Sequence, residues 1–405
     1  MIACFAILGM AEGVWVVHIP LVQAWLHLSD GSLGAVLLVG PGAVVLMMPV
    51  AGWLADRFGS ARVARPIGVV VTFLSVILDW ARTLSMLLAG LLAFGMAAGL
   101  LAVAINAQAV LVERGYRRPL MASFHAWYSI GGLSGALLGG ILASVRAGPV
   151  AVCLAAALPA AVVAAAAGCG LVEEPAMMRR GRPGPGPDRR GNAREARSGP
   201  SSLRLVALGL LALCCLVSEG TAGNWSGVYL RDNLGTPSGF AVLGFVAFSV
   251  TMTGGRLIGD RLAARFGPVR LVRGGGLLAA SSLAAGLASN NPVAAVAGFA
   301  LFGAGLSCAI PQLFSAAGNA NPDQPGTGLA RVAGLGYVGL VSGPVLIGAC
   351  AALTGLPVAL GIPVVLGLCV AASARVLDPL WPPGRRAAAA VTGGGAAGPG
   401  ASAAS

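Results

Sequence analysis

Long apolar runs, separated by short segments that contain arginine, are the dominant pattern along the chain. Several runs have 18 or more residues, so each is long enough to cross a hydrocarbon core of about 30 Å at about 1.5 Å of rise per residue. The pattern predicts an all-α integral membrane protein with twelve transmembrane helices. The predicted spans are residues 1–26, 32–54, 66–81, 86–112, 119–145, 148–171, 203–228, 238–262, 270–289, 292–316, 327–351 and 355–377.

The spans fall into two sets of six, which predict an N-terminal bundle over residues 1–172 and a C-terminal bundle over residues 203–381. Residues 173–202 between them are polar, rich in proline and glycine, and contain seven arginines, so we predict a flexible cytoplasmic linker. The alternative for these arginines is a contact with anionic lipid. Residues 382–405 have low complexity and predict a disordered cytoplasmic tail.

The placement of arginine predicts the orientation in the membrane. All 26 basic residues are arginine, and most of them lie in the loops after the second, fourth, sixth and eighth spans. The loops after the third, fifth and seventh spans hold one arginine each, Arg82, Arg146 and Arg231, and the loop after the tenth span offers only Arg331. By the positive-inside rule we expect both termini in the cytoplasm of a bacterium and the protein in its cytoplasmic membrane.

The amino-acid composition limits the kinds of partner that the protein is expected to have. Only 10% of the residues are charged and 57% are hydrophobic, so the lipid bilayer is the expected environment. The net charge of +12 is also typical of nucleic-acid binding, but the arginines lack the interleaved aromatic residues of a strand-binding groove. We therefore predict no nucleic-acid partner.

An internal repeat relates the two halves. The pattern RFGxxRxxR begins at Arg57 and again at Arg265, an offset of 265 − 57 = 208 residues. The same offset relates Phe94 to Phe302, and an offset of 207 relates Glu12 to Glu219. Since each half has an even number of spans, the repeat is parallel, which is typical of carriers whose halves rock about a central site.

The stretch GWLADRFGSAR resembles the loop motif G-x-L-a-D-R-x-G of the major facilitator superfamily, and the resemblance covers the whole chain. Three further stretches, NAQAVLVERGYRRPLMASFHAWYSIGGLSG, EGTAGNWSGVYLRDNLG and GYVGLVSGPVLIG, are similar to the bacterial branch related to fucose permease. The resemblance implies two parallel six-helix pseudo-repeats with a cavity between them. Ser60 departs from the basic residue that the motif prefers, and Asp260 precedes its RFG by one additional helical turn.

The two copies of this motif predict cytoplasmic gating contacts. Asp56 ends the second span, and the start of the eleventh span has unpaired N–H groups that attract a carboxylate. We predict that Asp56 lies against residues 326–331, as the family resemblance also implies, and that Asp260 lies against residues 119–123. The gating residues expected in the two copies are Gly52, Asp56, Arg57, Gly59, Arg62, Gly255, Asp260, Arg261, Arg265 and Gly267.

Two acidic residues lie inside apolar spans, Glu12 in the first and Glu219 in the seventh. A carboxylate at membrane depth is costly unless it is paired, hydrated or protonated, so both are candidates for proton coupling or substrate binding. The alternative is a neutral structural residue bonded to a neighbouring helix, and for Glu219 also a lock between the halves. We expect Glu12 to face the central cavity, because a lipid-facing carboxylate has no partner there.

Other polar residues are weaker candidates. Asn106 and His125 form a polar group in the fourth and fifth spans, which indicates either interhelical hydrogen bonding or a proton relay. Trp15 marks either the membrane interface or a surface for sugar stacking. The family resemblance implies that the tenth span lines the cavity, which adds Gln312.

The sequence lacks the motifs that are typical of common classes of enzyme. The eight cysteines lie inside apolar runs without a CxxC pair, which indicates packing. The sequence has no phosphate-binding loop, no metal-spaced His/Cys set and no nucleophile elbow. We predict that the protein is not an enzyme and that it needs no cofactor and no metal.

The predicted function is secondary active transport of a small, sugar-like solute by alternating access, coupled to protons, by a monomer. Fucose itself is not expected, because the family resemblance implies an acidic residue in the fourth span, where Ala102 and its neighbours offer none. Two alternatives stay open. One is a proton-driven exporter of amphipathic compounds, and the other is a non-transporting membrane sensor on the same scaffold.

Overall fold

The computed structural model describes residues 1–28, 30–145, 148–173, 200–320 and 324–378, and almost all of these residues are helical. Ten helical stretches within these ranges are long and apolar enough to cross a membrane. Each predicted span corresponds to one helix or one broken helix of the structure. The predicted all-α fold with twelve spans is therefore confirmed.

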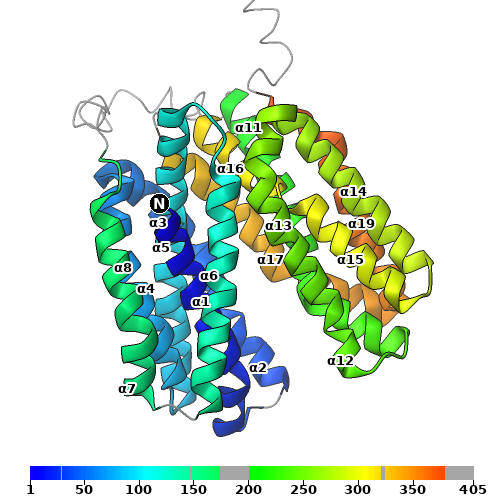
Figure 1. Ribbon diagram of the computed structural model, residues 1–405, viewed down its shortest axis with the longest axis horizontal. Coiled ribbons are helices and arrows are strands. Elements are labelled where there is room, and N and C mark those ends of the chain that lie inside the picture. Colours follow the sequence, from blue (N-terminus) through cyan, green and yellow to red (C-terminus); the bar gives the residue numbers. More distant parts are fainter. Residues whose placement is uncertain (29, 146–147, 174–199, 321–323, 379–405) are drawn as a thin grey trace, which may run out of the picture.

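The N-terminal bundle accounts for the first six spans (Figure 1). The second span is α2 followed by α3, and the sixth is α7, the π-helical η1 and α8. The elements are α1 (Ile2–Trp25), α2 (Asp30–Leu37), α3 (Val39–Phe58), α4 (Ser60–Asp79), α5 (Leu84–Tyr116), α6 (Met121–Ser144), α7 (Pro149–Val152), η1 (Cys153–Ala157) and α8 (Leu158–Cys169).

The C-terminal bundle repeats this order, with breaks in the eighth, tenth and twelfth spans. Its elements are α11 (Pro200–Val228), the π-helical η3 (Tyr229–Asn233), α12 (Ser238–Ala241), α13 (Leu243–Phe266), α14 (Pro268–Ala288), α15 (Pro292–Leu306), α16 (Ala309–Ala320), α17 (Pro325–Thr354), α18 (Leu356–Ala359), α19 (Gly361–Ser373) and the 3-10 helix η4 (Ala374–Leu377).

Most of the predicted linker and all of the predicted tail lie outside the described residues. Of residues 173–202, the structure describes 173 and 200–202, and the last three already belong to α11. The C-terminal bundle therefore begins about three residues earlier than the apolar pattern predicted, because Pro200 opens the helix before its apolar face starts.

Local chemistry explains several helix ends. The Thr83 hydroxyl accepts from the N–H of Met86 at 3.2 Å and caps α5. The Asn291 side chain accepts from two N–H groups and caps α15. Gly355 ends α17 with a φ of +86°, a conformation that other residues rarely adopt.

The two bundles meet at one end of the molecule and separate toward the other (Figure 1). We call the end where residues 173 and 200 lie the linker end, and the opposite end, where α2, α7 and α12 lie, the far end. Across the boundary, α3 packs against α17 and α6 against α13, while α16 contacts α5 and α6. The pairs α3–α17 and α13–α6 are equivalent under the repeat.

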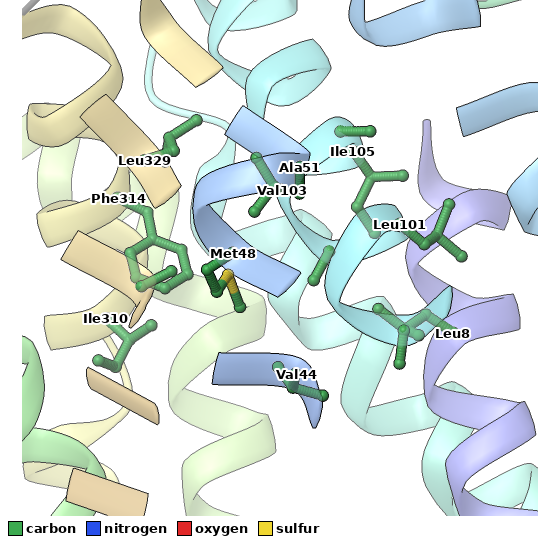
Figure 2. Packing of buried hydrophobic residues seen from close by; sticks show 14 of the residues in the cluster. Leu8, Val44, Met48, Ala51, Leu101, Val103, Ile105, Ile310, Phe314 and Leu329 are labelled. Carbon is green, nitrogen blue, oxygen red and sulfur yellow. The ribbon is translucent and has the colours of Figure 1, made fainter. Parts of the chain in front are cut away.

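A shared core joins the bundles beside this boundary. Figure 2 shows Met48 and Val103 of the N-terminal bundle near Ile310, Phe314 and Leu329 of the C-terminal bundle. All five belong to one buried cluster that includes residues of both bundles. The bundles are therefore not separate folded units with a wet interface; they share apolar packing there.

Glycines allow α1 and α6 to pack backbone against backbone. A Cβ added at Gly131 would collide with the carbonyl oxygen of Ala6, and one added at Gly135 would collide with that of Met10. Gly9 of α1 faces the carbonyl oxygen of Tyr128 in the same way. The glycine spacing seen in the sequence therefore produces close helix packing, which holds the first half of α1 against α6.

We predict that Gly131→Ala lowers the free energy of unfolding by about 1–3 kcal/mol, because the added methyl has to displace backbone. Gly140→Ala is the matched control on the same helix, since no atom lies within 4 Å of its added Cβ. Thermal unfolding in detergent should show a lower midpoint for the first variant and an unchanged or slightly higher midpoint for the second. Equal midpoints would contradict this packing.

Candidate functional site

A cavity of about 110 Å³ lies between the two bundles, and residues of both bundles form its wall. Most of the wall is apolar, including Phe5, Met48 and Phe314. The polar and charged residues in the wall are Asn106, His125, Tyr128, Glu219, Arg256 and Tyr337. A mainly apolar pocket with a few convergent polar groups is typical of a site for a small ligand.

Glu12 is connected to this cavity only through a neighbouring side chain. It is partly buried on α1, and it is not among the residues that line the cavity. The hydroxyl of Tyr128, which does line the cavity, donates a hydrogen bond to the Glu12 carboxylate. The structure thus differs from the expectation that Glu12 itself faces the cavity, because Tyr128 on α6 lies in the wall beside it.

Glu219 lines the cavity and faces a residue that the sequence analysis missed. Nη2 of Arg256 lies 3.5 Å from Oε2 of Glu219, and Nη1 donates to the Ser129 hydroxyl of the other bundle at 2.7 Å. The signal was present in the sequence: Arg256 lies inside the predicted span 238–262, one turn before Asp260. An arginine at that depth is a functional candidate by the rule applied to the two glutamates.

Asn106 and His125 are brought together as predicted. Nε2 of His125 lies 3.2 Å from Oδ1 of Asn106, and the Asn106 amide donates to the carbonyl oxygen of Ala102 at 2.8 Å. The His125 ring also contacts the rings of Phe5 and Phe314. These contacts favour interhelical hydrogen bonding, and the proton-relay role stays a prediction.

Trp15 and Gln312 lie apart from the cavity wall. Trp15 is buried in the shared apolar core, which favours a packing role over sugar stacking. Gln312 is buried on α16, and its Nε2 atom has no hydrogen-bond partner in the described part of the chain. We assign no role to either residue.

The contact predicted for Asp56 is present at the linker end. The N–H groups of Gly326 and Thr327 donate to its two carboxylate oxygens at 3.0 and 2.8 Å, and the Thr327 hydroxyl donates as well. A Cβ added at Gly52 would lie 2.7 Å from the Cβ of Ala330, so glycine is needed for this approach. We call these contacts the first latch.

The second latch is the equivalent contact of Asp260. Its carboxylate accepts from the N–H groups of Ala122 and Ser123 at 2.9 and 2.8 Å, as predicted from the repeat. The additional turn is also present, because α3 ends 58 − 56 = 2 residues after Asp56 and α13 ends 266 − 260 = 6 residues after Asp260.

Gly255 does not make the gating contact that was predicted for it. It packs against Ser307 of its own bundle, whereas Gly259 faces the other bundle, 2.8 Å from the Cβ of Ala122 when a Cβ is added. The cause is helical rotation. Gly52 precedes its aspartate by four residues and shares its face, but Gly255 precedes Asp260 by five, a rotation of about 140°.

The repeated RFG marks the end of a helix. Gly59 and Gly267 terminate α3 and α13 with φ values of +92° and +76°. Arg57 lies over the rings of Trp53 and Phe58, and Arg265 lies over the ring of Phe266. The motif arginines Arg57, Arg62, Arg261 and Arg265 are all exposed, as expected for side chains that anchor a loop at the membrane surface.

Two neighbouring residues at the linker end were missed. Glu113 accepts from the N–H groups of Leu120 and Met121 at 2.8 and 3.0 Å and also from the hydroxyl of Ser315. Arg114 donates to Asn319 and to the carbonyl oxygen of Gly318, both at 2.8 Å. Arg114 was interpreted only as a topology signal and Glu113 was not singled out, because nothing in one sequence shows what lies across the boundary.

These contacts define the conformation. Within the described residues, the hydrogen bonds that join the two bundles lie at the linker end or beside the cavity, and the bundles separate toward the far end (Figure 1). The structure is therefore a form of the molecule that is closed at its linker end.

Comparisons with known proteins agree with this architecture. The family model described as Major Facilitator Superfamily matches residues 1–318 and, in a second match, residues 208–399. The chain is similar to an uncharacterized MFS-type transporter of Yersinia pestis, with 33% identity over 378 residues that cover 92% of this chain and 94% of that protein.

Two solved structures share the fold. The Escherichia coli fucose:proton symporter FucP superposes with a TM-score of 0.74 and 16% identity, over 93% of this chain and 98% of that one. The human organic anion transporter MFSD10 superposes with a TM-score of 0.69 and 18% identity, over 93% of this chain and 99% of that one. Identities this low support the common fold alone.

The first latch predicts the effect of Asp56→Asn. Loss of the charge weakens the contact with the start of α17 by about 1–2 kcal/mol, which changes a two-state ratio roughly five- to thirtyfold. In a chain without its native cysteines, a reporter cysteine at Leu329, which is 1% exposed and lines the cavity, should react faster with a polar thiol reagent. Asp232→Asn at an exposed site is the control, and equal rates in the two variants would refute the latch.

Proposed function

The chain belongs to the major facilitator superfamily, and on that premise we propose that it is a proton-coupled secondary transporter that moves a small solute by alternating access. Members of the family are membrane transporters and not enzymes, as the sequence predicted. The proposal concerns the class of solute, the coupling to protons and the direction of transport.

Alternating access is supported by the position of the cavity. It lies between two pseudo-equivalent bundles, which are held by the two latches at the linker end. Release of the latches would allow the bundles to rock and to expose the cavity at the linker end instead. Two parallel six-helix repeats about a central site provide the geometry for such a movement.

Proton coupling rests on one observation, the hydrogen bond from Tyr128 to Glu12. Tyr128 lines the cavity, so a solute that binds there can compete for its hydroxyl. The Glu12 carboxylate then loses its donor inside the membrane, which favours uptake of a proton at that carboxyl group. Solute binding and protonation are thereby linked through a single side chain.

The arginines support a cytoplasmic linker end. Exposed arginines lie beside the two latches, Arg57 and Arg62 where α3 meets α4, and Arg261 and Arg265 at the end of α13. Arg82 follows the opposite end of α4, and Arg231 lies in η3, after the end of α11 that is opposite to Pro200. By the positive-inside rule, this distribution supports a cytoplasmic location of both termini. We propose a multi-pass protein of the bacterial cytoplasmic membrane that acts as a monomer.

The polar groups of the cavity wall support a small, polar, sugar-like solute. Asn106, His125, Tyr128 and Tyr337 offer hydrogen-bonding groups beside the ring of Phe314. The shared fold of the fucose:proton symporter is consistent with such a solute. Fucose itself is not proposed, because Ala102 and its neighbours on α5 provide no carboxylate.

We predict that Glu12→Gln abolishes proton-coupled flux and leaves ligand binding intact. Ligands are first identified by thermal shift of the purified chain against sugars, sugar acids and amphipathic drugs. Each ligand is then added to proteoliposomes that contain a pH-sensitive dye. The wild type and Glu173→Gln, a control at an exposed carboxylate, should acidify the lumen, and Glu12→Gln should not.

Acidification by Glu12→Gln at the wild-type rate would refute the role of Glu12. Movement of amphipathic drugs out of cells, driven by an inward proton gradient, would favour an exporter. Binding by the wild type without any flux would favour a sensor, and would refute transport as the function.

A further inference from the structure

We propose that Arg256 recognises an anionic group of the solute, so that the transporter selects small polar compounds that bear a carboxylate, such as sugar acids. The inference rests on the proposed transport function and names the substrate class of the same cavity. Arg256 is then the residue that determines the specificity for this class of solute.

Arg256 is a buried cation in the cavity wall. Its side chain is 7% exposed, and it projects from α13, near the middle of a membrane-spanning helix. A guanidinium group has five N–H donors and is always charged. A buried charge of this kind persists only where paired acceptors compensate for the loss of water.

The protein satisfies this guanidinium only in part. Nη1 donates to the Ser129 hydroxyl, but Nε has no hydrogen-bond partner in the part of the chain that the structure describes. The single charged partner there is Glu219, through one pair of atoms at 3.5 Å. A bidentate arginine–carboxylate pair has two contacts of about 2.7–2.9 Å, so a stronger arrangement is open to this arginine.

Glu219 is placed as an exchangeable counter-ion. Its side chain is 30% exposed, compared with 7% for Arg256, and it also lines the cavity. The other carboxylate near Arg256 on the same helix, Asp260, is engaged by the N–H groups of Ala122 and Ser123. A carboxylate of the solute therefore has one competitor, Glu219, and can replace it with two parallel hydrogen bonds to the planar guanidinium.

The same geometry disfavours a neutral solute at this position. A neutral hydroxyl that displaced Glu219 would leave the buried guanidinium without a charged partner, whereas a carboxylate restores the pair. Since the position of Arg256 is fixed by Ser129 of the other bundle, recognition of the anion would also join the two bundles at the cavity.

The test is the dissociation constant of matched probe pairs for the purified full-length chain, obtained from thermal unfolding at increasing probe concentration. Each pair differs in a carboxylate against a neutral hydroxymethyl group: D-galacturonate with D-galactose, D-glucuronate with D-glucose, and lactate with propylene glycol. We expect at least one carboxylate to stabilise the wild type, with its neutral counterpart at least about tenfold weaker.

Two variants separate recognition from structure. Arg256→Gln should abolish the preference for the carboxylate, while Arg231→Gln, at an exposed arginine paired with Asp232, should keep it. Glu219→Gln removes the competing charge and should tighten carboxylate binding several-fold. A purely structural ion pair predicts the opposite, because breaking it would weaken the fold and the site together. This second variant keeps the test decisive if Arg256→Gln does not fold.

The proposal is overturned if neutral probes bind as tightly as their carboxylate counterparts, if no carboxylate stabilises the protein, or if Glu219→Gln weakens carboxylate binding. Proton-coupled flux of neutral sugars alone would overturn it and leave the proposed transport intact. Carboxylate binding without flux would support recognition of the anion by Arg256 and would refute the proposed transport.

Discussion

The two bundles are joined where a carboxylate of one meets the unpaired N–H groups at the start of a helix in the other. The first turn of a helix leaves such groups without partners and with a partial positive charge. Asp56 satisfies them at the start of α17, and Asp260 does so at the start of α6. These two contacts, together with those of Glu113 and Arg114, close the linker end beside the cavity.

The contacts are suited to a reversible closure. A charged contact at a helix end contributes about 1–2 kcal/mol, which is enough to favour one conformation and too little to prevent the other. The neighbouring apolar core that includes Met48 and Phe314 is shared by both bundles and excludes water from the closed end. The polar groups that remain, Glu12 through Tyr128 and Arg256 with Glu219, then lie where a solute and a proton can act on them.

Periodicity and the repeat allowed much of this arrangement to be predicted, because they fix which residues lie on a helix and how deep in the membrane. The spans, the additional turn of α13 and both aspartate contacts followed from that information. Rotation about each helix axis was harder to predict. Gly255 therefore packs inside its own bundle, and Glu12 reaches the cavity only through Tyr128. Glu113 was missed because its importance depends on Ser315 across the boundary, which one sequence does not show. Arg256 was missed although its depth in the span 238–262 marked it as a candidate.

The most direct test of the account is the distance between the bundles at both ends, measured by pulsed electron spin resonance in chains without native cysteines. One label pair replaces exposed residues Tyr116 and Phe266 at the linker end, and the other replaces Val145 and Val242 at the far end. When both latches are removed together by Asp56→Asn and Asp260→Asn, the account predicts longer distances at the linker end and shorter distances at the far end. Unchanged distributions, or longer distances at both ends, would contradict it.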